Sequence, residues 1–498
     1  MGDQRKVLVN AKVPARCSTR IVEEIEPAGC GIHFNELHQA FAHPFISVFG
    51  RFKMEHLAVR RISTCCIKPD PPLGPEQNAI VDLAPWDIAM LSVHYIQKGL
   101  LFHDPPRSDP PLLDRLKSSL ARTLSVFYPL AGRLVTQKTE SSDEGDKLVV
   151  FIDCHNGDAE FILAEADLAV SDILDPIDVP EVVKSFFPYS AAINHDSHSL
   201  PLLSVQVTEL KDGVFIGCNF NHAVGDGTAF WNFFYAWGQM ARIGEISRKP
   251  IIERFFLDCK SPFYLPFSDL TQHLHRHVSP PLRERMFHFS ADTMRSLKSK
   301  ANAQRGTTNT ISSFQALCAL VWQSITRARR HLSMDQNTSC RLAINNRTRL
   351  DPPLSSDYFG NCIYAVSSIN TKKGELLSKD LGWAAWLLHQ TVVGHSDGAV
   401  RELVKTWVEA PQIYSLSMFD PCGVMVGSSP RFDMYGCEFG CGKAVAARSG
   451  YANKFDGKVS AYPGREGGGS VDLEVCLPPE TMALLESDSV FMDAESLD

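Results

Sequence analysis

One continuous stretch, residues 201–242, holds two strand patterns, a turn and a helix pattern in direct succession. Apolar residues alternate over 203–207, and a second strand pattern over 214–220 follows Asp212-Gly213. Two such runs joined by Asp-Gly are typical of an antiparallel hairpin. The apolar residues that come next keep the i, i+3, i+4, i+7 spacing of a helix with one buried face: Phe230, Phe233, Phe234, Trp237 and Met240. The stretch therefore predicts strand, strand and helix. Because strand-like and helix-like patterns interleave throughout the chain from Met54, we expect an α/β fold.

The length of the chain favours two domains. With 498 residues, of which 44% are hydrophobic, the chain exceeds what one hydrophobic core normally accommodates. The periodic pattern weakens over 241–285, where proline and aromatic residues are frequent, so we expect an inter-domain connection there. The predicted domains are 54–240 and 286–498. Residues 1–53 read as an N-terminal extension, either disordered or wrongly included by the assigned start; a plastid transit peptide is the alternative, which the acids of "IVEEIEPAG" disfavour.

Charge and hydropathy exclude several kinds of partner. The net charge is −8 and no long run of Lys or Arg occurs, so a nucleic-acid partner is not expected. No window approaches eighteen consecutive apolar residues, and we expect a cytoplasmic monomer without a membrane partner. The fourteen cysteines are scattered, several of them inside apolar runs, as buried reduced thiols are. No His/Cys set has the spacing of metal ligands, so no metal site is predicted.

His222 and Asp226 fall in the turn between the second strand pattern and the helix. A histidine at such a turn could act as a general base, because its pKa lies close to working pH. It could equally be a polar residue with its hydrogen bonds satisfied, and Asp226 could simply cap the helix that begins near Thr228. The residues of the turn leave both interpretations open.

Wider matches give these two residues a context. His222, Asp226 and Gly227 form HxxxD-G, and "EFGCG" follows far downstream at 438–442. In this pattern the chain resembles the plant BAHD acyl-CoA-dependent acyltransferases, whose end motif is DFGWG. Three further segments resemble the family in order and spacing, over 119–134, 310–329 and 345–362, the last containing "YFGNC". The resemblance covers the chain from Met54 to its end.

The resemblance implies both a fold and an activity. The fold would consist of two similar-sized α/β domains related to chloramphenicol acetyltransferase, with a channel between them and His222 midway along it. Acyl-CoA would be a co-substrate, and no cofactor would be bound permanently. His222 would take the proton from a hydroxyl, or less often an amine, of a plant specialised metabolite as that group attacks the thioester. The resemblance implies a ternary complex without an acyl-enzyme.

The same resemblance assigns supporting roles around the turn. Asp226 would point away from the substrate and pair with an arginine, for which Arg347 is preferred over Arg349. Together with Gly227, this pair would hold the turn that aims His222.

Candidates for CoA binding and for stabilising the oxyanion also come from the resemblance. Lys298, Ser312 and Ser313 could meet the phosphates and pantetheine of CoA, although Lys298 could be a solvated helix residue and Ser312 a helix cap. Some relatives carry a Thr-Ser-Trp triplet ahead of the end motif, which here aligns with Gly427-Ser428-Ser429. Ser429 could donate to the oxyanion, and an ordinary loop serine is the alternative.

A second class of function stays open. The chain could use the same fold for elimination (lyase) chemistry or for non-catalytic binding. The retained His222 favours acyl transfer, whereas the altered end motif favours the second class.

The resemblance gives the end motif a structural role. Glu438, Phe439, Gly440 and Gly442 would form a tight turn with an ion pair at its acidic residue. Cys437 and Cys441 offer only two thiolates, too few for a metal site on their own. Cys441 stands where the family has a tryptophan.

Replacing Cys441 by tryptophan tests whether this position is underfilled. Because a missing indole leaves a gap in a core, we expect Cys441→Trp to be tolerated and to raise the melting temperature. A lowered melting temperature would show that the neighbouring residues have repacked around the thiol.

Overall fold

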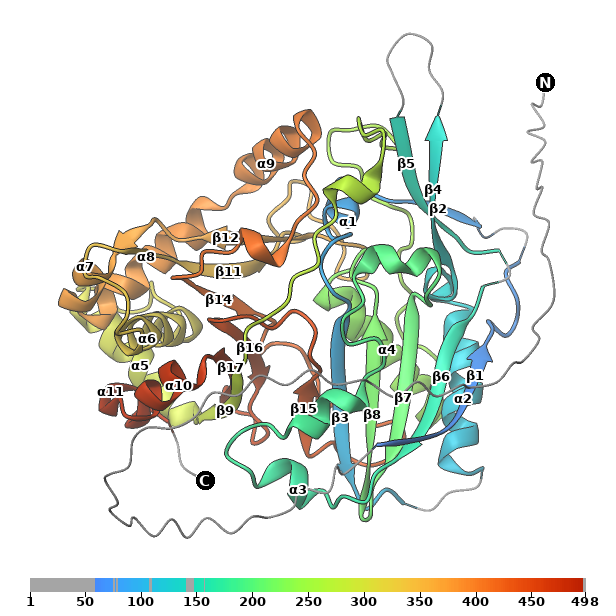
Figure 1. Cartoon of the computed structure of the whole chain (residues 1–498), viewed down its shortest axis with the longest axis horizontal. Helices are drawn as coiled ribbons and strands as arrows, with labels where there is room; N and C mark the ends of the chain where they lie inside the picture. The colour runs from blue at the N-terminus through green and yellow to red at the C-terminus, as the bar shows by residue number, and fades with distance from the viewer. Residues whose placement is uncertain are drawn as a thin grey trace, which may run out of the picture. The chain divides into compact units, whose positions relative to one another are not determined.

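The structure is a computed structural model that describes residues 59–495, apart from 75, 76, 78, 107–109, 140–146 and 156. The predicted extension, 1–53, lies outside the described residues. Two six-stranded mixed sheets with helices packed on them make up the described chain (Figure 1). The predicted α/β class is confirmed. None of the described helices is both long and apolar enough to cross a membrane.

The first sheet receives most of its strands from the N-terminal half of the chain. In spatial order its strands are β1 (Arg60–Ile67), β6 (Ala159–Glu165), β7 (Leu203–Glu209), β8 (Gly213–Phe220), β3 (Ile96–His103) and β15 (Ala446–Ser449). Only β6 and β7 run parallel. The β7–β8 pair confirms the predicted hairpin. The edge strand β15 comes from the C-terminal half, so this half completes the first sheet.

The second sheet belongs wholly to the C-terminal half. Its order is β12 (Ile363–Ser367), β11 (Cys340–Asn345), β14 (Val424–Gly427), β16 (Lys458–Pro463), β17 (Val471–Leu477) and β9 (Arg283–Phe289). Two smaller sheets contain β2 (Ile80–Asp82), β5 (Lys147–Asp153) and β4 (Arg133–Thr139), and β10 (Asn337–Thr338) and β13 (Thr371–Lys372). In the second sheet β14 pairs in parallel with both β11 and β16.

Helices cover the sheets, and one of them follows the candidate turn directly. The α-helices are α1 (Pro85–Ala89), α2 (Leu112–Leu124), α3 (Ser171–Leu174), α4 (Gly227–Ile243), α5 (Ala291–Gln304), α6 (Ser313–Ala328), α7 (Lys373–Ser378), α8 (Leu381–Gly394), α9 (Asp397–Glu409), α10 (Pro479–Glu486) and α11 (Ser489–Met492). The described residues also form five short 3-10 helices, η1 (Tyr128–Ala131), η2 (Glu181–Phe186), η3 (Asn194–His198), η4 (Leu270–His273) and η5 (Leu416–Met418). The predicted helix after the hairpin is α4. It is fastened to α2 by Trp237, whose Nε1 donates to the Leu116 carbonyl at 3.2 Å and the Ser119 hydroxyl at 3.1 Å.

Between α4 and β9 the chain is mostly irregular. Its described residues contain only η4 as a helical turn, together with two isolated bridges, one pairing Leu265 with Leu148 and the other Ile251 with Tyr358. This irregularity agrees with the expected connection. The domain limits at 240 and 286 stay a prediction.

The "EFGCG" segment is a turn packed against α4. The Phe439 ring is buried, with its centroid 4.7 Å from that of Trp237 and 4.9 Å from that of Phe234. Glu438 pairs with Arg242 of α4 at 3.3 Å. The turn depends on glycine, since φ is 74° at Gly440 and 81° at Gly442, where side chains are strained.

The two cysteines of this turn are buried, free thiols. Burial raises the pKa of Cys441 to about 11 and also raises that of Cys437, so both are protonated near neutral pH. No group of three or more potential metal ligands occurs among the described residues. Here the thiols act as small core residues.

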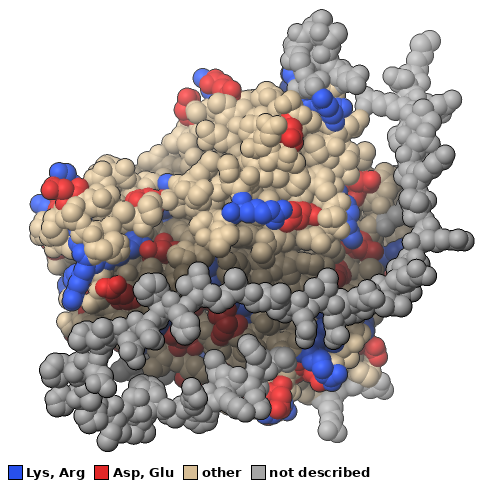
Figure 2. Space-filling model, in the orientation of Figure 1, with Lys and Arg blue, Asp and Glu red and all other residues tan. Residues whose placement is uncertain are grey.

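Charges are distributed without a basic field on the visible face. Figure 2 shows Lys and Arg side chains singly or beside acidic ones on that face. On this face the visible side chains form no basic track for a phosphate backbone.

Candidate active site around His222

His222 follows β8 directly and is fixed through its backbone. Its N–H donates to Asn194 Oδ1 at 2.8 Å, and the neighbouring Asn221 side chain donates to the Asn194 carbonyl at 2.8 Å and to the Ser197 hydroxyl at 2.8 Å. The His222 side chain is only half-buried. Hydrogen bonds therefore fix the backbone of the turn, while His222 keeps part of its surface exposed.

Of the two glycines in this turn, Gly225 is the one that the packing requires. A Cβ at Gly225 would lie 2.6 Å from the Cβ of Ala229, which is too close. A Cβ at Gly227 would make only ordinary contacts with the Phe432 ring at 3.5 Å. The packing therefore gives no steric reason for glycine at 227, and the supporting role of Gly227 stays a prediction.

Asp226 is the hub of the turn and is completely buried. One carboxylate oxygen accepts from the N–H groups of Thr228 at 3.0 Å and Ala229 at 3.1 Å, so Asp226 is the N-cap of α4. The other accepts from the Cys362 N–H at 2.9 Å. Arg347 donates to both oxygens, at 2.7 and 3.1 Å. The capping role and the arginine pairing thus occur together.

Arg347 extends this contact to a second loop. It is 1% exposed, and its Nη2 also donates to the carbonyls of Tyr358 and Gly360, each at 3.0 Å. Arg349, the other candidate, instead donates to the carbonyls of Val392 and His395. The ion pair therefore joins the His222 turn to the loop between β11 and β12.

That loop carries Asn361, which contacts the imidazole. Asn361 Oδ1 lies 3.2 Å from His222 Nδ1, and its Nδ2 donates to the His222 carbonyl at 2.7 Å and to Asp87 Oδ1 at 2.8 Å. Because Nδ2 faces two acceptors, the amide oxygen must face Nδ1, which therefore carries the proton. In neutral His222 the lone pair is then on Nε2.

Asp87 of α1 and Arg254 hold Asn361 in place. Asp87 is fully buried and accepts from the N–H groups of Asn361 and Ala84, each at 3.0 Å. Arg254 pairs with it at 3.3 Å and also donates to the carbonyls of Val224, at 2.8 Å, and Phe359. Burial raises the pKa of Asp87, although Arg254 and the hydrogen bonds from Asn361 oppose that shift.

Electrostatics favour the neutral form of His222. Burial lowers its pKa below the ordinary value of 6.5, and the positive charge of Lys458 lowers it further. Asp226 and the hydrogen bond with Asn361 act in the opposite direction. A neutral imidazole with its lone pair on Nε2 can accept a proton, as a general base must.

The candidate CoA residues lie on neighbouring helices. Lys298 is in α5, Ser312 is the N-cap of α6, and Ser313 is the first residue of α6. Asn302 brings them together, because its Nδ2 donates to the carbonyls of Lys298 at 2.8 Å and Ile311 at 2.9 Å. The Ser312 hydroxyl accepts from the Gln315 N–H at 3.2 Å, so Ser312 caps α6, as the alternative interpretation expected. Their role towards CoA stays a prediction.

Ser429 lies in the loop after β14 and takes part in a local turn. Its hydroxyl accepts from the Arg431 N–H at 3.2 Å. This contact is typical of an ordinary loop serine, and donation to an oxyanion stays a prediction.

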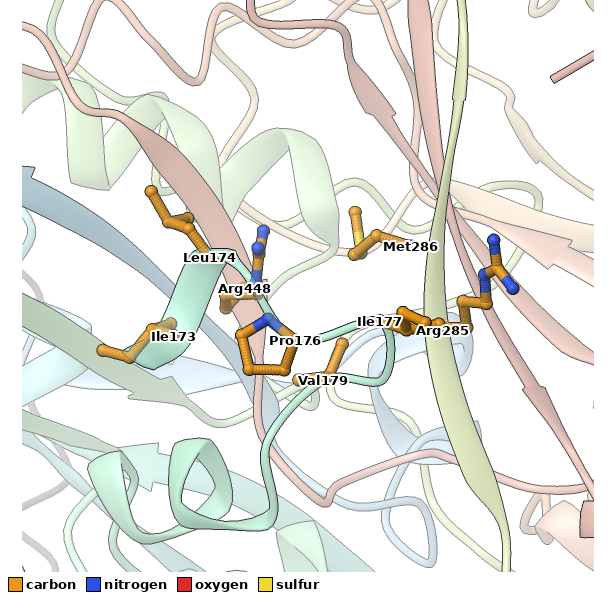
Figure 3. A pocket seen from close by; sticks show the side chains of 8 residues that line it. All are labelled: Ile173, Leu174, Pro176, Ile177, Val179, Arg285, Met286 and Arg448. Carbon is orange, nitrogen blue, oxygen red and sulfur yellow. The ribbon is translucent and has the colours of Figure 1, made fainter. Parts of the chain in front are cut away.

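One separate cavity lacks the groups that catalysis needs. It has a volume of about 170 Å³ and is shown in Figure 3. Apolar side chains from α3 and the segment after it line most of its wall, and Arg285, Met286 and Arg448 complete it. Its lining contains no carboxylate, histidine, cysteine or hydroxyl group that could act as a base or a nucleophile.

Comparisons with known proteins show which family the chain resembles along most of its length. Residues 57–492 match the family described as "Transferase family". An uncharacterized acetyltransferase of Arabidopsis thaliana is 35% identical over 87% of this chain and 98% of its own length. The BAHD acyltransferase DCR of the same plant is 32% identical over 88% of this chain and 93% of its own length.

Two solved structures share the fold. Vinorine synthase superposes with a TM-score of 0.66 at 20% identity, covering 89% of this chain and 99% of its own. TRI101 of F. graminearum, complexed with coenzyme A and deoxynivalenol, superposes with a TM-score of 0.65 at 18% identity, covering 83% of this chain and 98% of its own. The predicted fold class is confirmed.

Removing the charge of Asp226 should destabilise the whole fold. Asp226→Asn leaves Arg347 buried without a counter-ion, and we expect a loss of about 3 to 5 kcal/mol in the free energy of unfolding. Urea denaturation measures this loss. The matched control is Asp258→Asn, which removes an exposed partner of Arg401 and should leave stability nearly unchanged. Equal stability of Asp226→Asn and the wild type would contradict the proposed hub.

The protonation of His222 can be followed directly by NMR. Because burial lowers its pKa, the ring should gain its proton only as the pH falls below 6.5, and it should be neutral at pH 7. The resonance is assigned by its loss in His222→Gln. A midpoint at or above 6.5 would contradict this prediction.

Proposed function

Since the chain belongs to the transferase family of plant BAHD acyltransferases, we propose that it transfers an acyl group from acyl-CoA to a hydroxyl of a plant specialised metabolite, with His222 as general base. One observation carries this proposal. Asn361 accepts from Nδ1 of a half-buried imidazole, which leaves Nε2 free to take a proton. An amine acceptor fits the same chemistry less well, because amines are mostly protonated near neutral pH.

The reaction requires one proton transfer in each direction. Nε2 of His222 removes the proton from the acceptor hydroxyl as its oxygen attacks the thioester carbonyl. The tetrahedral intermediate then collapses, the carbon–sulfur bond breaks, and the proton on Nε2 passes to the CoA thiolate. Both substrates are bound together, and no covalent acyl-enzyme forms.

The surrounding residues position the base. Asn361 Oδ1 accepts from Nδ1–H, so it stabilises the imidazolium that forms when Nε2 gains its proton. The Asp226–Arg347 pair and Asp87 hold the two loops that place this contact. We further propose acyl-CoA as a co-substrate, with no permanently bound cofactor, for a cytoplasmic monomer.

The alternative of elimination chemistry or a binding role depended on the altered end motif. Glu438 still forms an ion pair and Phe439 still packs against α4. The altered motif therefore retains a structural role, and it gives no specific support to the alternative.

A donor and acceptor panel tests the proposed function. The full chain is incubated with several acyl-CoAs and several alcohols or amines, and the released CoA thiol is measured. Because a general base typically contributes about 10²- to 10⁴-fold, His222→Ala should lower the rate by that factor. His155→Ala, at an exposed histidine, is the control and should match the wild type. Absence of CoA release with every donor, or full activity of His222→Ala, would contradict the proposal.

A further inference from the structure

A network of charged side chains links the two sheets. Lys98 of β3 donates to the Tyr462 hydroxyl of β16 at 2.6 Å, and Tyr462 donates to Glu474 of β17 at 2.6 Å. Ser449 of β15 donates to the same Glu474 oxygen at 2.6 Å. The other Glu474 oxygen accepts from Lys454 at 2.6 Å. The facing strands of the two sheets are thus joined through one buried carboxylate.

The carboxylates of this network are already engaged. Lys454 pairs with Glu284 as well as with Glu474, and Lys184 pairs with Glu284 at 3.0 Å and with Glu181 at 2.7 Å. Neither of the two buried carboxylates, Glu284 and Glu474, therefore lacks a lysine partner. A further cation in this region would have no counter-ion of its own.

Lys458, the first residue of β16, is such a cation. Among the residues the structure describes, its ammonium has no carboxylate within 4.0 Å and no hydrogen-bond partner. The side chain is half-buried, so a solute could reach it. Burial lowers the pKa of Lys458 to about 8, with Cys476 and Glu474 opposing the shift, so most of it is charged at pH 7.

The position of the ammonium depends on a glycine. Lys458 Nζ lies over Gly427 of β14, where even a single added methyl group would clash with it. Met425 of the same strand is the register partner of Lys458, so the side chain reaches along β14 towards its end. Gly427 therefore makes room for the ammonium.

The ammonium also acts on the candidate base. Strand pairing brings this end of β14 towards the His222 turn, because Val426 pairs with Leu342 of β11, and Asn345 at the end of β11 donates to Thr228 at the start of α4 at 3.4 Å. In agreement with this placement, the positive charge of Lys458 contributes to the lowered pKa of His222. An uncompensated cation near a general base can receive an anionic group of a bound substrate. Charge-assisted hydrogen bonds to an ammonium are among the strong ones in proteins.

We propose that Lys458 binds a carboxylate of the substrate next to His222, so that either the acyl donor or the acceptor carries a free carboxylate. This inference rests on the proposed function. The carboxylate would supply the counter-ion that the protein does not provide. It would also fix the orientation of the substrate relative to Nε2.

Two variants change this subsite in different ways. Lys458→Met removes the charge at similar volume, and Gly427→Ala keeps the charge but displaces the ammonium. Because an unpaired, partly buried cation does not stabilise a fold, Lys458→Met should melt at or above the wild-type temperature. Lys211→Met, at an exposed lysine paired with Asp167, is the matched control.

Binding is measured by calorimetry on the full chain with two probe pairs. Succinyl-CoA against butyryl-CoA tests a carboxylate on the donor, and 4-hydroxyphenylacetate against its methyl ester tests one on the acceptor. The wild type and Lys211→Met should bind the carboxylate member of one pair about 10- to 100-fold more tightly than the neutral member. Lys458→Met and Gly427→Ala should lose this preference and bind the neutral member as the wild type does.

The pair that shows the preference identifies the source of the carboxylate. Equal affinities within both pairs for the wild type, or a preference that survives in Lys458→Met and Gly427→Ala, would overturn the inference. A variant that lowers kcat equally for both members of a pair without changing their relative affinity would point to oxyanion stabilisation and would also overturn it. Failure of the proposed function is a separate result, because absent CoA release does not affect the measured affinities.

Discussion

The buried ion pair between Asp226 and Arg347 is the contact on which the candidate site depends. Neither residue is more than 1% exposed, and the pair joins the turn after β8 to the loop before β12, two segments more than a hundred residues apart. A buried pair of this kind contributes little net stability but strongly constrains geometry, because either charge alone would be costly. By holding both loops, the pair brings Asn361 to His222. The orientation of the base is thus a property of two distant segments acting together.

The local parts of this arrangement could be predicted from the sequence. The hairpin, the helix after it and the turn holding His222 and Asp226 follow from residue periodicity and turn chemistry. Arg347 as the partner of Asp226 came from the family resemblance, since no spacing indicates a contact across the fold. The α/β class could be predicted because strand and helix patterns alternate along the whole chain.

The residues that orient the base could not be predicted individually. Asn361 lies in a segment that the sequence singled out only for its resemblance to the family. Asp87 lies in the short helix α1, far upstream of both His222 and Asn361. Asn361 reaches His222, and Asp87 reaches Asn361, only once α1, β8 and the loop before β12 have packed together. The one signal in the sequence for a polar contact was Asn361 itself, because its amide stands among the aromatic and small residues of "YFGNC". The steric requirement for glycine at 225 likewise depends on the close approach of Ala229, which only the folded structure shows.

The edge strand β15 has a consequence for how the protein is made. It pairs with β3, which lies some 350 residues earlier in the chain, so β3 has no neighbour on that side until residues 446–449 have left the ribosome. During synthesis, the first sheet would expose an open edge of hydrogen-bonding groups, which is prone to pairing with other chains. The sheet can therefore close only late in synthesis, once most of the C-terminal half has been made. A chain interrupted before β15 would lack this closure and, with it, both Ser449 and Glu474, whose hydrogen bond joins the two sheets.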